Sequence, residues 1–91
     1  MSDQVTCKKL TIATAGTVTQ VDSQVRIVRR ATVRNPSTNA GLVYFGGSNL
    51  AATAQASLVV GAEFILYDID IASLYVTTAN NNEKVEIVYN L

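Results

Sequence analysis

The sequence lacks the residue types that most catalytic and metal-binding sites require. It contains no histidine and no tryptophan among its 91 residues. The missing histidine excludes Ser-His-Asp triads and histidine-ligated metal sites. The phosphate-binding patterns GxxxxGK(S/T) and GxGxxG are also absent. We therefore predict a protein that is not an enzyme and that binds neither a cofactor nor a metal ion.

Cysteine and long hydrophobic runs are equally scarce. Cys7 is the only cysteine, so an intrachain disulfide bond is excluded. We predict that Cys7 is a small buried residue of the core, because free cysteine is often buried. No apolar run approaches the roughly 18 residues of a membrane helix, and residues 1–10 lack the apolar segment of a signal peptide. We expect no membrane partner and a cytoplasmic location at synthesis.

Charged residues make up only 15% of the chain, and seven basic residues balance seven acidic ones. A neutral chain has no general attraction to nucleic acids or acidic membranes. Residues 1–45 carry six basic and two acidic side chains, whereas residues 46–91 carry one and five. The two halves could therefore attract each other between subunits, or they could interleave within one domain. A small chain that is 48% hydrophobic is also expected to self-associate.

Short runs of β-branched and aromatic residues alternate with turns rich in Gly, Asn, Asp and Ser. The runs lie at residues 5–13, 17–21, 25–33, 42–45, 58–60, 63–67, 74–78 and 84–90. They predict an all-β fold, a single domain over residues 1–91 that forms an antiparallel β-sandwich of jelly-roll type with seven or eight strands. Residues 1–4 are expected to form a frayed end or a partner-binding arm, and residues 48–57 a loop or a brief helical turn.

Period-2 alternation assigns one side of each strand to the core. The predicted core residues are Leu10, Ile12, Ile27, Val33, Tyr44, Phe64, Leu66, Leu74, Val76, Val85 and Ile87. In the run at residues 25–33, Val25 is expected on the same apolar face. Arg29 also falls on that face, which predicts a bulge or a bend there.

Arginine is concentrated in one segment. Arg26, Arg30 and Arg34 share the polar face of the predicted strand. Guanidinium groups bind phosphates or carboxylates, but nucleic-acid binding usually adds a basic excess or exposed aromatic residues. We therefore predict that these three arginines dock on an acidic protein partner and that nucleic acid is not a partner.

Asp68 and Asp70 come nearest to a metal site, since carboxylates two positions apart share one strand face. They could hold a cation weakly. Acidic turn residues show the same pattern without a ligand, and the oxygen-ligand series of an EF-hand is missing. The prediction of no metal site is unchanged.

Five segments resemble small virion proteins of tailed bacteriophages. They are VRN at residues 33–35, LVYFGGSNL at 42–50, LVVGAEFIL at 58–66, IDIASLYV at 69–76 and VEIVYN at 85–90. Proteins of that kind carry a YVG or YFG strand end, a PGE turn and an LYV strand. The resemblance extends from Arg34 to Tyr89. Here Gly61-Ala62-Glu63 follows valine and stands where PGE would be expected.

The resemblance implies a β-sandwich that acts as a structural virion protein. Its leading form is a capsid decoration, or cement, protein that is a homotrimer and binds the major capsid protein of the same virion without covalent bonds. Its location would then be the capsid surface, after assembly in the host cytoplasm. The alternative is a tail or fibre β-domain that takes part in attachment to the host surface.

Overall fold

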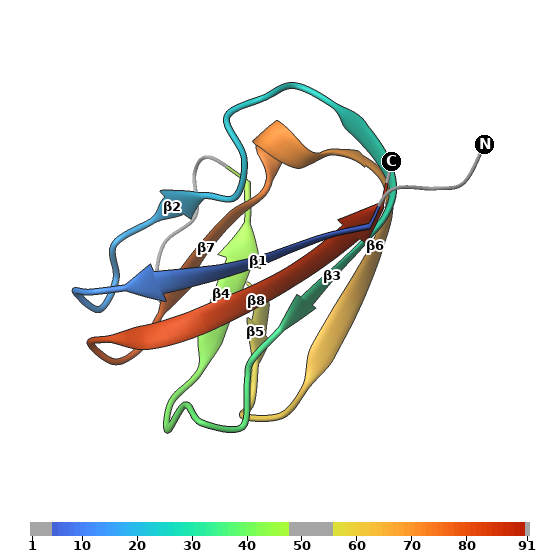
Figure 1. The fold of residues 1–91 in the computed structure, drawn as a ribbon. Coiled ribbons are helices and arrows are strands. Elements are labelled where there is room, and N and C mark those ends of the chain that lie inside the picture. Colours follow the sequence, from blue (N-terminus) through green and yellow to red (C-terminus); the bar gives the residue numbers. More distant parts are fainter. Residues whose placement is uncertain (1–4, 48–55, 91) are drawn as a thin grey trace.

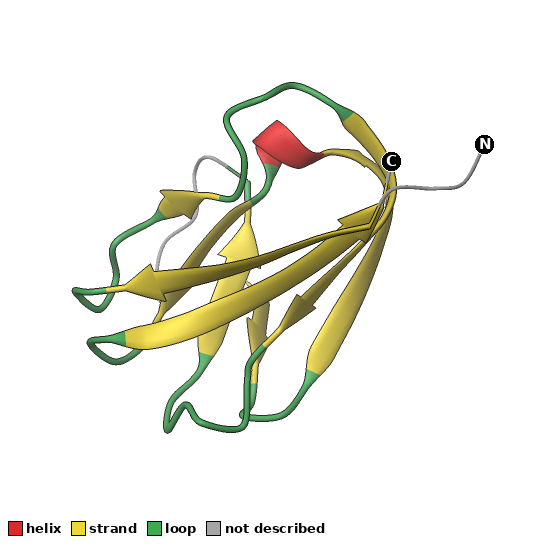
Figure 2. Cartoon of the chain, viewed as in Figure 1, coloured by secondary structure: helices red, strands yellow, loops and turns green. Residues whose placement is uncertain are grey.

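The computed structural model describes residues 5–47 and 56–90, which form two packed β-sheets (Figure 1). The strands are β1 (Val5–Ile12), β2 (Thr19–Gln20), β3 (Ile27–Arg34), β4 (Val43–Gly46), β5 (Ala56–Leu58), β6 (Glu63–Asp70), β7 (Tyr75–Thr78) and β8 (Glu83–Asn90). One 3-10 turn, η1 (Ile71–Ser73), precedes β7 and is the single red element of Figure 2. The predicted all-β fold is confirmed. The expected arm at residues 1–4 and most of the loop at residues 48–57 lie outside the described residues.

The strand order is that of a jelly roll. Sheet A has the order β1-β8-β3-β6 and sheet B has the order β2-β7-β4-β5. The antiparallel pairs β1·β8, β2·β7, β3·β6 and β4·β5 are those of one long hairpin whose two arms are β1–β4 and β5–β8. Rolling that hairpin places alternate pairs in opposite sheets, which is the arrangement of the double-sheet jelly rolls. β1 and β6 are the edge strands of sheet A.

The core lies between the two sheets and is built from their alternating inward side chains. Its buried members are Ile12, Val21, Val28, Ala31, Val33, Val43, Phe45, Leu58, Ile71, Leu74, Val76, Val85, Ile87 and Tyr89. Six predicted core residues are among them, and Leu10 and Leu66 pack against them. Phe45 of sheet B and Phe64 of sheet A meet with ring centroids 5.2 Å apart, so an aromatic contact joins the sheets at one side.

Three predicted core residues differ from the expectation. Ile27 is 66% exposed and Phe64 is 47% exposed, although the ring of Phe64 still points to the inner side. Tyr44 is half-buried and alternates with buried Val43 and Phe45, so it belongs to the opposite face of β4. Alternation alone could not show which face of β4 meets the other sheet.

The cause of the error at Ile27 is a change of phase within β3. Val28 is fully buried and so is Ala31, and an odd spacing between two inward residues means that the strand does not alternate regularly there. In the ladder with β6, Val28 pairs with Ile69 and Arg30 pairs with Tyr67, but Arg29 is not paired. Opposite Arg29, Asp68 has a φ of 53°. The irregularity predicted at Arg29 is confirmed, and it turns Val25 and Ile27 outward, where both are exposed.

A buried amide network fixes the loop between β3 and β4. Asn35 donates from Nδ2 to the carbonyls of Gly41 and Leu58, each at 2.9 Å. Asn39 donates to Asn35 Oδ1 at 2.8 Å and accepts from the backbone N–H of Lys84 at 3.0 Å. These bonds satisfy buried polar groups and hold the loop that contains Pro36 against both sheets.

Candidate interaction surface

The three arginines predicted to share a docking face do not share one. Arg30 and Arg34 lie on β3 and are exposed on the outer side of sheet A. Arg26 precedes β3, and its Nη2 atom donates to Asp22 Oδ2 at 2.9 Å. The expectation of one continuous arginine face is therefore wrong for Arg26. Its guanidinium group bonds to Asp22, and the irregularity in β3 separates it from Arg30 and Arg34.

Arg26 belongs instead to the Asp22 cluster, formed by Lys8, Asp22, Arg26 and Tyr89. Asp22 is 8% exposed. Its Oδ2 atom accepts from the Tyr89 hydroxyl at 2.7 Å and lies 3.4 Å from Lys8 Nζ. Its Oδ1 atom accepts from the backbone N–H of Gln24 at 2.9 Å. One carboxylate thus connects β1, β8 and the segment between β2 and β3.

These bonds shift the pKa values of two side chains, Asp22 and Tyr89. The N–H of Gln24 and the hydroxyl of Tyr89 hold the pKa of Asp22 well below its ordinary value, and Arg26 and Lys8 act in the same direction against the effect of burial. Burial and the neighbouring carboxylate raise the pKa of Tyr89. Because the carboxylate is buried and has four partners, we read the cluster as a structural tie between strands rather than a reactive site.

The second acidic feature of the sequence is also structural. Asp70 Oδ1 accepts from the backbone N–H groups of Ala72 and Arg26, at 3.0 and 3.1 Å, and so caps η1. No group of three or more potential ligands that could hold a metal ion exists within residues 5–47 and 56–90. Asp68 lies in the positive-φ position opposite Arg29.

The strand register arranges the outer face of sheet A into three rows that cross its four strands in the order β1, β8, β3, β6. The charged row is Lys9, Glu86, Arg34 and Glu63. The apolar row is Cys7, Val88, Thr32 and Ile65. The terminal row is Val5, Asn90, Arg30 and Tyr67. No described element covers this face, because sheet B packs on the other side.

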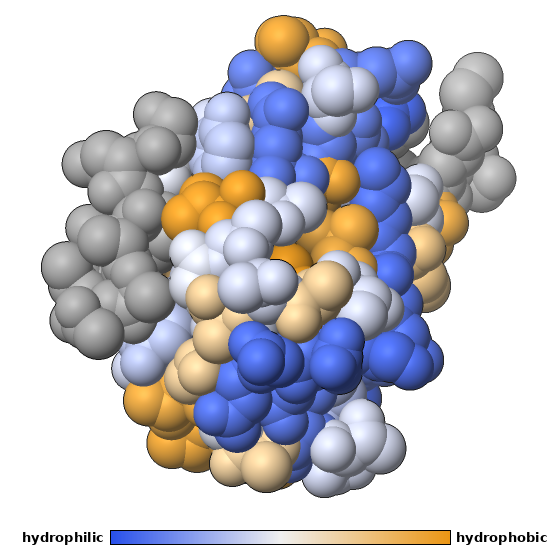
Figure 3. Space-filling model, turned by 90° about the vertical axis from the view of Figure 1, so that its left-hand side faces the viewer, coloured by the Kyte–Doolittle hydropathy of each residue, from blue (hydrophilic) through white to orange (hydrophobic). Residues whose placement is uncertain are grey.

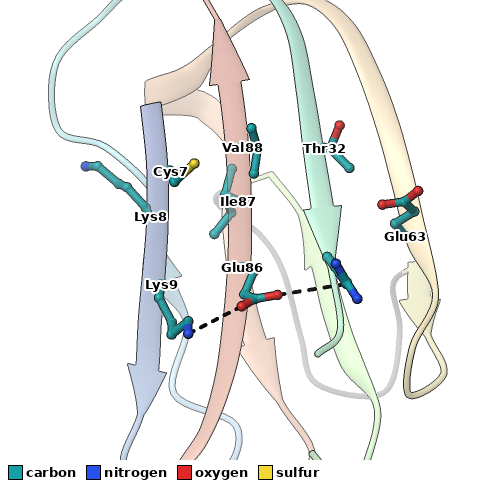
Figure 4. Close-up of a pocket in the computed structure, with 9 residues that line it drawn as sticks. Cys7, Lys8, Lys9, Thr32, Glu63, Glu86, Ile87 and Val88 are labelled. Carbon is teal, nitrogen blue, oxygen red and sulfur yellow. Dashed lines mark ion pairs between the residues drawn. The ribbon is translucent and has the colours of Figure 1, made fainter. Parts of the chain in front are cut away.

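The charged row is linked along its length by ion pairs. Lys9 Nζ lies 3.4 Å from Glu86 Oε2, and Arg34 Nε lies 3.9 Å from Glu86 Oε1. Figure 4 shows both pairs as dashed lines, with Glu63 further along on β6. The signs alternate across the sheet as plus, minus, plus, minus. Lys9 and Arg34 are both more than half exposed, so these pairs contribute little to folding.

The charged and apolar rows line a shallow depression of about 380 Å³. Cys7 lies in it and is exposed, at the level of Val88 and Thr32 in the strand register. The prediction that Cys7 is a core residue is therefore wrong. Leu10 and Ile12 occupy the inward positions of β1, and Cys7, an odd number of residues from both, must face outward.

Exposed apolar side chains lie on this face and elsewhere on the described surface. Of the nine large hydrophobic residues exposed in the described part of the chain, Val5, Ile65, Tyr67 and Val88 belong to the rows of sheet A. The side that faces left in Figure 1 shows hydrophobic atoms between hydrophilic ones (Figure 3). What distinguishes sheet A is the order of its residues, with the apolar row between a charged row and a row of mixed character.

Sequence reasoning found Arg30 and Arg34 of this surface and missed Lys9, Glu63 and Glu86. Each acidic residue stood alone in the sequence, without a visible partner. Long-range pairing across the sheet brings them together: β1, β3, β6 and β8 come from all parts of the chain. The opposite net charges of the two halves were the available signal, and in this row the two halves do interleave within one sheet.

Neither a protein-family model nor a curated protein matches the sequence. A solved structure of Bacillus endospore appendages, described as a novel family of disulfide-linked pili, aligns with 99% of this chain and 88% of its own, at 19% identity and a TM-score of 0.48. No helix in the described residues has the length and hydropathy to cross a membrane.

Proposed function

We propose that this chain is a structural protein of a bacteriophage virion that decorates the capsid and acts by non-covalent contact through the outer face of sheet A. The observation that carries the proposal is the four-stranded face that no described residue covers, with an apolar row between a charged row and a row of mixed character. Protein interfaces have this anatomy, an apolar centre inside a polar rim. Jelly rolls include viral capsid domains, which supports the proposal by analogy of fold alone.

The chemistry of the described residues supports assembly over catalysis. The strongly perturbed carboxylate, Asp22, is occupied by its own partners. The remaining charges of sheet A lie on an open surface and around a shallow depression, where they are accessible to another protein. The partner we propose is the major capsid protein, with Arg30 and Arg34 as contact residues. A homotrimer stays a prediction from the sequence.

The proposal is tested on purified virions. Quantitative mass spectrometry should find the chain in tens to hundreds of copies per particle, as capsid decoration requires. A few copies per particle would indicate the tail or fibre alternative instead. Complete absence from particles would refute a virion role.

Particle binding then tests the surface. The double variant Arg30→Ser/Arg34→Ser should load onto undecorated particles several-fold less well than wild type, since exposed charge pairs each contribute little and act together. Ser57→Glu on the exposed edge strand β5 of sheet B is the control and should load normally. If the double variant loads like wild type and the control does not, the docking face lies on sheet B.

A further inference from the structure

From the geometry of sheet A we infer that its outer face binds a second copy of the same chain, related by a twofold axis that runs parallel to the strands. This inference rests on the proposed function in one respect, namely that the face is a contact surface. It adds an occupant for the chain away from particles: the dimer uses Arg30 and Arg34, so it must dissociate before the same face meets the capsid protein. An isologous contact requires a surface that is complementary to itself, and the three rows of sheet A meet that requirement.

The charged row provides the first argument. A twofold axis along the strands keeps each row at its own level and reverses the order of the strands, so that β1 faces β6 of the partner and β8 faces β3. Lys9 then lies opposite the partner's Glu63, and Glu86 lies opposite the partner's Arg34. Symmetry repeats both pairings. Every charge of the row meets one of the opposite sign, and complementary charges of this kind fix the register of an interface.

The other two rows match under the same operation. In the apolar row, Cys7 faces Ile65 and Val88 faces Thr32, so the centre of the contact is apolar. In the terminal row, Val5 faces the ring of Tyr67, which is 63% exposed. Arg30, which has no ion-pair partner among the described residues, faces the side-chain amide of Asn90 and can donate to its carbonyl.

The alternative twofold axis in the plane of the face, perpendicular to the strands, fails this comparison. It would place each strand opposite the same strand of the partner, and the charged row opposite the partner's terminal row. Arg34 would then lie opposite Arg30, a like-charge contact that is costly in an interface. Lys9 would lie opposite Val5. The sequence of charges therefore selects one of the two axes.

The size of the face limits the contact to a weak dimer. β3 pairs with β8 over five residues only, so this axis brings five levels of each strand into contact. Four strands about 4.8 Å apart and five residues at about 3.3 Å each give roughly 19 by 16 Å, and two such faces together cover about 600 Å², below the roughly 1,000 Å² of a stable specific interface. Sheets packed face to face also stack readily, at about 10 Å. We expect a dissociation constant in the tens of micromolar, weaker than that of a standard-size interface.

The test uses a complementary charge exchange between two variants. Lys9 and Glu63 lie on opposite edges of one sheet, about 14 Å apart by strand spacing, so they do not pair within a chain. The homodimer of Lys9→Glu would bring glutamates together at both pairings, and the homodimer of Glu63→Lys would bring lysines together. In a dimer of one variant with the other, both pairings are again of opposite sign.

Sedimentation velocity at concentrations up to about 200 µM should give wild type a mass of twice the 9.7 kDa chain. Each variant alone should bind itself at least tenfold more weakly, and an equimolar mixture should recover the wild-type dimer. Ser57→Glu serves as the charge control and should dimerise normally. Circular dichroism and urea unfolding of both variants establish that the fold is unchanged.

Several results would overturn the inference: a wild-type monomer at the highest concentration, a wild-type trimer, variants that still dimerise, or a mixture that does not recover. The outcome is separable from that of the proposed function. A monomer that still loads onto particles through Arg30 and Arg34 refutes the dimer and retains the virion role. If the chain passes the exchange test but is absent from virions, the dimer is retained and the virion role is refuted.

Discussion

Lys8 and Lys9 are neighbours on β1 and take part in two networks on opposite faces of sheet A. Lys8 points inward, donates to the carbonyl of Val21 at 3.1 Å and lies 3.4 Å from the carboxylate of Asp22. Lys9 points outward to Glu86 at the same distance of 3.4 Å. The two ion pairs have equal length and differ in their surroundings, because Asp22 is buried and Glu86 is in contact with solvent.

The difference shows that burial, and not distance, decides what an ion pair does. A buried carboxylate that loses a partner leaves unsatisfied groups behind, so the inner network holds strands together. The outer network can exchange its partners with water or with another protein at little cost. The inner face of sheet A therefore specifies the fold, and the outer face is available for assembly.

The largest expected effect separates the two faces at adjacent residues of β8. Ile87→Ala should lower the free energy of unfolding by about 3–4 kcal/mol, because it leaves a cavity in the core, where Ile87 is fully buried. Val88→Ala, on the outer face, should cost less than about 1 kcal/mol. Urea unfolding measures both. Equal losses would mean that the outer face is covered in the isolated chain.

Removal of the Asp22 charge should come next. Asp22→Asn is expected to cost about 2–3 kcal/mol, less than a fully buried pair because Lys8 and Arg26 are partly exposed. Glu86→Gln, which breaks the corresponding pairs of the outer row, should cost under about 0.5 kcal/mol. Urea unfolding at neutral pH measures both. If the two variants lose the same free energy of unfolding, burial does not separate the inner network from the outer one.

The phase change in β3 gives a third comparison. Val28→Ala should destabilise the fold by about 2 kcal/mol, since it removes two buried methyl groups and leaves a small cavity. Ile27→Ala, the neighbouring residue, should change stability by less than about 0.5 kcal/mol, because Ile27 is on the surface. Regular alternation from residue 25 predicts the reverse order, so thermal unfolding of the two variants decides between the two patterns.

The smallest effect concerns pH. The pKa of Asp22 is lowered in the folded chain, so the unfolded chain takes up the proton first. The stabilisation from this group is complete above about pH 4, the ordinary aspartate value, and declines as the pH falls below it. Wild type should lose up to about 1.4 kcal/mol more per pH unit than Asp22→Asn does. Urea midpoints between about pH 5 and pH 2.5 measure this difference, and parallel slopes would refute it.

Much of the strand pattern was predictable because it depends on neighbours in the sequence. Turn residues such as Gly16, Gly61 and Asn82 do adopt positive φ, and the apolar alternation in β8 placed Val85 and Ile87 in the core. The failures at Ile27 and Cys7 have two different origins. Ile27 is turned outward by the irregularity at Arg29, which depends on the pairing of β3 with the distant strand β6. Cys7 was assigned to the core from the usual burial of free cysteine, although it lies an odd number of residues from Leu10 and Ile12 and alternation places it outward.

The sequence by itself determined that this chain is all-β, that its strands end at glycine, asparagine and aspartate turns, and that it lacks histidine chemistry. These properties are local, since period and turn propensity involve residues a few positions apart. Only the tertiary structure decided that Arg26 joins Asp22 and that Lys9, Glu86, Arg34 and Glu63 form one row. Such a row depends on the pairing of β1, β8, β3 and β6, and that order arises from closing the jelly roll, which no local pattern encodes.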